Sequence, residues 1–181
     1  MKKIIILFIL VFGLCGCKIE ESTAKKTIEL YFQSYNSLSD EVIRDLNRVV
    51  DGENYTDDQR RLYKDILKRQ YKDLKYDIIS ESYNGDTAVV RAKIQVYNYY
   101  SVQKQAEEHL KKNINQFYND GKYDNNKYLD YKLSLMNSTS ERVEYTIDFN
   151  LVRENDEWVL NEITSSDLEK IHGVYNYEFF S

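Results

Sequence analysis

The chain has 181 residues and a formal net charge of −5, with 30% charged and 14% aromatic residues. This length is that of one domain of ordinary size, large enough to bury a hydrophobic core. The acidic balance argues against the basic surface with which proteins bind nucleic acid, so we expect no nucleic-acid partner. It also argues against a second, electrostatic contact with anionic lipid.

A basic tip and a short apolar run open the chain. Lys2 and Lys3 precede an apolar run of roughly 11 residues over positions 4–14. A helix needs about 20 such residues to cross a bilayer, so this run is too short for a membrane span. The pattern is typical of a secretory signal peptide.

The end of this run, Leu14-Cys15-Gly16-Cys17, resembles the lipobox of bacterial lipoproteins. The resemblance implies a signal peptide over residues 1–16 and a diacylglyceryl group on Cys17. Two acyl chains anchor a protein stably, so we expect attachment to the cell membrane on its extracytoplasmic face. The alternatives are an uncleaved anchor, or an ordinary signal peptide with incidental cysteines.

Both cysteines of the chain lie in this leader. The remaining domain can therefore form no internal disulfide, cysteine-based zinc site or thiol nucleophile. We expect a short tether over residues 17–23 and one domain over residues 24–181.

The first part of this domain has helical periodicity. Apolar residues at three- and four-residue steps predict a helix over residues 24–50, with a kink or break permitted at Ser37, Ser39 and Asp40. Thr56 and Gln59 have the spacing of a capping box, and a second amphipathic helix is predicted from there to about residue 75.

The periodicity then changes to that of strands. Residues 77–83 predict a strand, Asn84-Gly85 is a strong hairpin signal, and alternation over residues 88–96 predicts a half-buried partner that continues to Tyr100. Ser101 is the expected cap of a helix reaching Phe117.

In the second half of the chain, a predicted helix again precedes two predicted strands. A stop at residues 119–121 and a loop over residues 122–127 precede a short helix over residues 128–136. Strands are predicted at residues 143–151 and 158–163. Ser165 or Ser166 is the expected cap of a last short helix over residues 167–172, before an aromatic tail.

This order, α-α-β-β-α-α-β-β-α, predicts an α+β domain with a curved antiparallel sheet of about four strands packed on helices. The hairpin at residues 84–90 and the late Glu157-Trp158-Val159-Leu160 strand resemble the NTF2-like (cystatin-like) superfamily, and the uncharacterised lipoproteins of low-GC Gram-positive bacteria within it. The resemblance covers about residues 24–173. It implies a cone whose mouth can hold a small molecule or a peptide.

No catalytic constellation follows from the sequence. The apolar phase of the strands carries no acid or histidine, and His109 and His172 lack the spacing of a metal pair. Asp57-Asp58 and residues 119–124 are explained by a helix cap and a turn. We therefore expect no metal, no cofactor and no enzyme activity.

Tyrosine, with 17 copies, is the enriched residue with functional potential. If the tail returns to the rim of the sheet, aromatic residues could line a cone mouth; the favoured alternative is that they fill the core, as they often do in small cones. The candidate ligand-lining residues are Tyr97, Tyr99, Tyr100, Tyr175 and Tyr177.

The preferred hypothesis is a membrane-anchored, non-enzymatic protein that binds a protein or small-molecule ligand. One alternative is a small-molecule isomerase, dehydratase or hydrolase that uses the cone cavity. The other is a structural component of an envelope or secretion assembly.

Overall fold

The computed structural model describes residues 23–177, which form an α+β domain around a four-stranded antiparallel sheet of order β1-β2-β5-β6. Two hairpins build this sheet. The central pair, β2 with β5, joins them in a register that runs from Thr87↔Val152 to Tyr97↔Arg142, and the sheet is not closed. The strands are β1 (Lys75–Asn84), β2 (Thr87–Tyr97), β5 (Arg142–Glu154) and β6 (Glu157–Leu160).

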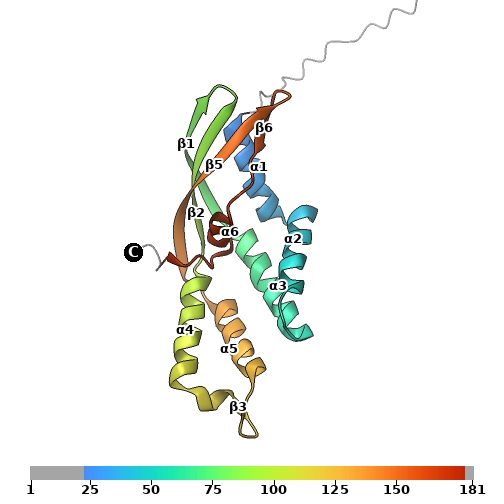
Figure 1. The fold of residues 1–181 in the computed structure, drawn as a ribbon, viewed down its shortest axis with the longest axis vertical. Coiled ribbons are helices and arrows are strands. Elements are labelled where there is room, and N and C mark those ends of the chain that lie inside the picture. Colours follow the sequence, from blue (N-terminus) through green and yellow to red (C-terminus); the bar gives the residue numbers. More distant parts are fainter. Residues whose placement is uncertain (1–22, 178–181) are drawn as a thin grey trace, which may run out of the picture.

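Residues 23–177 also form six α-helices, and this part of the chain is elongated (Figure 1). The predicted α+β class and the antiparallel sheet of four strands are confirmed, and the order of elements contains one more N-terminal helix and one more small hairpin than predicted. The helices are α1 (Ala24–Ser37), α2 (Asp40–Asp51), α3 (Asp57–Lys72), α4 (Tyr99–Lys112), α5 (Asn125–Ser138) and α6 (Ser165–His172).

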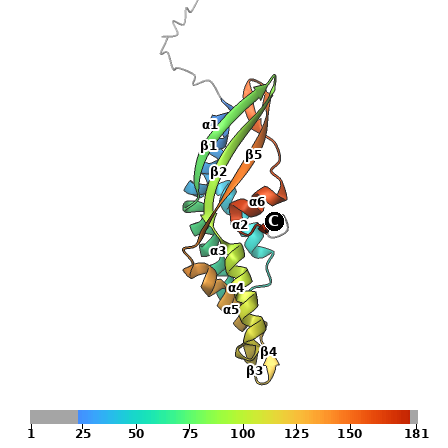
Figure 2. The same ribbon diagram turned by 90° about the vertical axis from the view of Figure 1, so that its left-hand side faces the viewer.

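The sheet is curved (Figure 2), and one of its faces holds the main core. Alternate residues of β2 are buried, as the period of two requires, and α1 contributes Ile28 and Phe32 to the same core. Ile171 of α6 joins them. The other face carries charge pairs between neighbouring strands, such as Arg91 with Asp148 at 2.7 Å. This division places every packed helix on one side of the sheet.

The predicted long first helix is divided at Leu38. This residue adopts the left-handed conformation, with φ of 53°, and Ser39 then caps α2 by accepting a hydrogen bond from the Val42 N–H at 3.4 Å. The Thr56–Gln59 capping box is present as predicted, with hydrogen bonds in both directions. The break turns α2 away from α1 and toward α3.

The helices α4 and α5 project beyond the sheet as an arm (Figure 1). The prediction that β2 continues to Tyr100 and that Ser101 caps α4 is wrong. The Asn98 side chain accepts the Ser101 N–H at 3.1 Å, so the helix begins at Tyr99. It also ends earlier than predicted, at Lys112, and leaves Ile114 46% exposed.

Between α4 and α5 lie a 3₁₀ turn, η1 (Ile114–Phe117), and a two-residue hairpin of β3 (Tyr118–Asn119) and β4 (Lys122–Tyr123). Asp120 and Gly121 have positive φ values of 49° and 78° at its turn. A loop and a helix stop were predicted here, and the Asp-Gly turn explains why a hairpin forms instead. This hairpin is the tip of the arm.

A buried amide connects the sheet to the last helix. The Gln70 side chain of α3 accepts the Tyr97 N–H at 2.9 Å and donates to the Ile171 carbonyl at 3.3 Å. Thr164, rather than the predicted Ser165 or Ser166, caps α6, and Gly173 ends it with φ of 74°. These contacts fix α6 against both α3 and the lower end of β2.

Gly173→Ala should be strongly destabilising. A Cβ at this position would lie 2.1 Å from the Tyr97 carbonyl oxygen, and the backbone is left-handed. We expect the free energy of unfolding to fall by about 2–4 kcal/mol, measured by urea denaturation.

Gly85→Ala is the matched control, because Gly85 has a similar φ of 59° but no atom within 4 Å of an added Cβ. Its free energy of unfolding should fall by only about 1 kcal/mol, which is the cost of placing alanine in a left-handed backbone conformation. Equal losses in the two variants would show that the close contact at Gly173 has no energetic weight.

Candidate functional site

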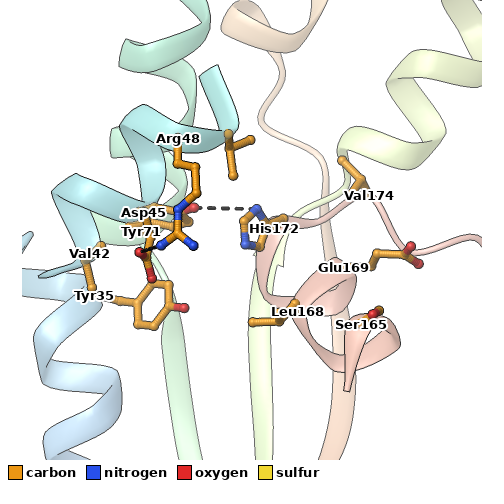
Figure 3. A pocket seen from close by; sticks show the side chains of 11 residues that line it. Tyr35, Val42, Asp45, Arg48, Tyr71, Ser165, Leu168, Glu169, His172 and Val174 are labelled. Carbon is orange, nitrogen blue, oxygen red and sulfur yellow. Dashed lines mark hydrogen bonds and ion pairs between the residues drawn. The ribbon is translucent and has the colours of Figure 1, made fainter. Parts of the chain in front are cut away.

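A pocket of about 380 Å³ opens between α2 and α6 (Figure 3). Its inner wall comes from the end of α1 and from α3, and its lining is mostly apolar. A volume of this size is within the range of small-molecule sites. The lining residues are Tyr35, Val42, Asp45, Arg48, Val49, Tyr71, Ser165, Leu168, Glu169, His172 and Val174.

Local structure explains why these elements leave a space. The turn at Leu38 directs α2 along α3, whereas Gln70 and Gly173 hold α6 close to β2. The apolar side chains of Val49 and Leu168 therefore face the gap from opposite sides instead of packing in a common core. Val49 remains 38% exposed.

A row of four rings leads from the sheet core to this pocket, and we call Tyr31, Tyr35, Tyr71 and His172 the aromatic row. Neighbouring rings meet edge to face, with centroid separations of 5.2, 5.0 and 5.6 Å along the row. The hydroxyls of Tyr31 and Tyr35 are 3.1 Å apart. Aromatic rings attract each other edge to face because the positive ring edge meets the negative ring face, so this arrangement is more favourable than direct face-to-face stacking.

The hydroxyls of the row are buried and stay protonated. Desolvation raises the pKa of Tyr71, and the neighbouring tyrosines and Asp45 raise it further. The pKa of Tyr35 is also raised, mainly by burial. These hydroxyls can therefore serve as hydrogen-bond donors and acceptors, but not as ionised groups at neutral pH.

His172 forms the end of the row and points into the pocket (Figure 3). Its Nδ1 lies 3.5 Å from the Tyr71 hydroxyl. Desolvation lowers the pKa of His172 to about 4, so the imidazole is uncharged at neutral pH. Burial therefore outweighs the stabilisation that a positive imidazole would gain at the C-terminal end of α6.

Charged residues lie at the pocket mouth. Arg48 forms an ion pair with Asp45, three positions earlier on α2, and both side chains are well exposed. Glu169 of α6 is also exposed and has no ion-pair partner among residues 23–177. The pocket mouth therefore has one ion pair, Arg48 with Asp45, and one carboxylate, that of Glu169, whose charge is not compensated.

The tyrosines predicted to line a ligand site lie elsewhere. The guanidinium groups of Arg69 and Arg142 lie over the Tyr97 ring, at 4.4 and 4.2 Å from its centroid, and the Tyr97 hydroxyl donates to Asp73 at 2.6 Å. Tyr99 is fully buried, and its hydroxyl donates to the Ile66 carbonyl at 3.2 Å. Both residues join the arm to the sheet.

Of the other three predicted residues, Tyr175 and Tyr177 lie in the segment after α6 and Tyr100 lies at the start of α4. Tyr100 meets Tyr177 edge to face at 5.0 Å, and Tyr175 meets Tyr145 in the same way at 5.7 Å. The structure thus brings Tyr100 and Tyr177 together, but none of the five tyrosines lines the pocket. Cys17 lies outside the described residues.

Two tyrosines that do line the pocket, Tyr35 and Tyr71, lie in the two segments for which the sequence predicts amphipathic helices. A signal for them was available, since Tyr35 and Tyr71 put hydroxyl groups at positions that periodicity assigns to the core. Buried hydroxyls need partners, so such positions predict either a polar contact or a pocket. The spacing of the residues cannot show that α6 meets α2 and α3 there.

Within the described part of the chain, no group of three or more His, Asp or Glu side chains is placed to hold a metal ion. No helix between residues 23 and 177 has the length and apolar character needed to cross a bilayer.

Comparisons of this chain with protein-family models, with curated proteins and with solved structures found no match.

The burial of His172 predicts a loss of stability in acid. The folded pKa of about 4 lies below the ordinary value of 6.5, so between these pH values the unfolded chain binds a proton that the folded chain does not. Stability should fall as pH decreases from 6.5 to 4, by about 2–3 kcal/mol from this group.

His172→Gln removes the proton but keeps a polar side chain. Subtracting its urea unfolding free energies from those of the wild type should give a difference that is constant above pH 7 and decreases toward pH 4. A difference that stays constant over the whole range would contradict a neutral, buried imidazole.

Proposed function

We propose that this protein is a lipid-anchored, extracytoplasmic binding protein that takes a small molecule into the pocket between α2 and α6. The anchor is the diacylglyceryl group expected on Cys17. The domain acts as a receptor or carrier and performs no chemistry on its ligand.

The pocket is the observation that supports this proposal. Its apolar walls supply hydrophobic contact, and the tyrosine hydroxyls, His172 and the charged mouth supply a few polar contacts. Binding sites for small molecules have this composition, with mostly apolar walls and a few polar groups that fix orientation.

Binding accounts for the polar groups better than catalysis does. The His172–Tyr71 pair is the nearest approach to an acid–base pair in the pocket. An imidazole with a pKa of about 4 is a weak base at neutral pH, and a tyrosine with a raised pKa is a weak acid. The isomerase-like alternative needs a group with a pKa near the working pH.

We place the domain among NTF2-like folds on the arrangement of its main elements. The N-terminal helix α1 crosses one face of a curved antiparallel sheet, and the strands of this sheet have the order β1-β2-β5-β6. The additional helix α2 and the arm of α4 and α5 are then elaborations of this plan. In this interpretation the interior of the cone is filled by the core, and ligand space lies beside it.

The start of α1 lies beside the β1–β2 hairpin, since the Lys25 N–H donates to Glu81 at 3.3 Å. The arm extends from the opposite end of the sheet (Figure 1). A lipid on Cys17 would therefore hold the hairpin end toward the bilayer and point the arm away from it.

Cys17→Ser tests the anchor. The lipobox resemblance assigns the lipid to the Cys17 thiol, so the variant should move from the membrane fraction to the soluble fraction, or accumulate as uncleaved precursor on a gel. A variant that fractionates and migrates like the wild type would show that the lipobox interpretation is wrong.

Binding in the pocket can be measured with N-phenyl-1-naphthylamine, a neutral apolar probe whose fluorescence rises when it is buried. The wild type should bind the probe saturably. Val49→Trp should reduce binding at least about tenfold, because the indole would fill the pocket mouth.

Val159→Trp is the matched control, since Val159 is 40% exposed, compared with 38% for Val49, and lies on β6 outside the pocket. It should bind the probe like the wild type. If both variants bind equally, the probe is not in the pocket and the proposal fails.

A further inference from the structure

The charges at the pocket mouth indicate the class of ligand that the pocket would bind. This inference rests on the proposed binding function. Of the residues that line the pocket, two are acids and one is a permanent cation. The cation, Arg48, is already in contact with Asp45. Glu169, on the opposite side of the opening, is the charge left without a partner among residues 23–177.

The interior adds no positive charge to oppose this carboxylate. His172 lies at the inner end of the pocket as a neutral imidazole, because burial lowers its pKa to about 4. Lys170, the neighbour of Glu169 in sequence, is directed elsewhere and binds Asp167 at 2.8 Å. Among the described residues that line the pocket, one negative charge is therefore uncompensated, that of Glu169 at the outer rim on α6, and no positive charge is free (Figure 3).

The walls provide the second kind of contact that an organic cation needs. The Tyr35 ring and the His172 ring border the space, and the Tyr35 and Tyr71 hydroxyls lie where Asp45 acts on them electrostatically. Aromatic faces attract ammonium groups through their quadrupole. Val49, Leu168 and Val174 supply the apolar surface for the remainder of such a ligand.

We infer that the pocket binds an organic cation, an amine with an apolar body, whose ammonium group lies at the mouth beside Glu169 and whose body packs between α2 and α6. Asp45 is a second carboxylate that the ligand can reach when Arg48 moves away. An anion would gain only Arg48, and would have to replace Asp45 to do so.

Three probes of equal length separate charge from apolar contact: 4-phenylbutylamine, 4-phenylbutanol and 4-phenylbutyrate. Each is titrated against the full chain with bound N-phenyl-1-naphthylamine, and displacement gives its affinity. The amine should bind about fivefold or more tightly than the alcohol, and the alcohol more tightly than the carboxylate.

Two charge variants have opposite expected effects. Glu169→Gln should lower the affinity for the amine about threefold to tenfold, because it removes the uncompensated carboxylate. It should leave the affinity for the alcohol unchanged. Arg48→Gln should raise the affinity for the amine by a similar factor, because it leaves the Asp45 carboxylate without its ion-pair partner. The matched controls are Glu157→Gln at the start of β6 and Arg44→Gln on α2, which lie outside the pocket lining and should change neither affinity.

The outcomes distinguish this inference from the function on which it rests. If the fluorescent probe binds in the pocket but the butyrate competes as well as the amine, the ligand class is wrong and the binding function stands. The inference also fails if Glu169→Gln and Glu157→Gln behave alike. If Val49→Trp leaves probe binding intact, the binding function itself fails.

Discussion

The arrangement of the whole domain depends on one buried amide, the side chain of Gln70. It is fully buried and joins three elements: its own helix α3, the last residue of β2 and the C-terminal end of α6. A buried amide without partners costs about 1–3 kcal/mol, so each of these contacts is strongly favoured once the group is inside. Gly173 allows this arrangement, because a larger residue would collide with the Tyr97 carbonyl and with the amide nitrogen of Gln70.

The pocket is a consequence of that junction. With α6 held against β2, and with α2 directed along α3 by the turn at Leu38, the two helices cannot close upon each other. The aromatic row fills the inner part of the gap, where Tyr35 and Tyr71 meet at a centroid distance of 5.0 Å, and the outer part stays open. The space therefore results from two fixed helix positions, and no single missing side chain explains it.

The sequence predicted the parts of this fold that local periodicity determines. Alternation along β2 identified its buried residues, and the Thr56–Gln59 box identified the start of α3, because each signal lies within a few residues. The start of α4 was misplaced, since both Asn98 and Ser101 are good caps and the choice depends on Glu141, whose carboxylate accepts from the Asn98 amide at 2.8 Å across 43 positions. The pocket was missed for the same reason. Its walls come from helices that meet only through long-range contacts, and His172 is neutral only because of that meeting.

The position of α1 relates the pocket to the expected anchor. This helix begins next to the β1–β2 hairpin and ends at Tyr35 in the pocket wall, and its 14 residues span about 21 Å at a rise of about 1.5 Å each. A tether from Cys17 to Thr23 adds at most about 20 Å when fully extended. A lipid on Cys17 would thus keep the pocket within about 40 Å of the bilayer surface. The charge of a bilayer surface is screened over a Debye length of about 8 Å in physiological salt, so it acts strongly only on a pocket held within one or two such lengths of that surface. Over the rest of the range that the tether permits, the nearest charges are those of the pocket lining, and Glu169 is the one of these without an ion-pair partner among residues 23–177.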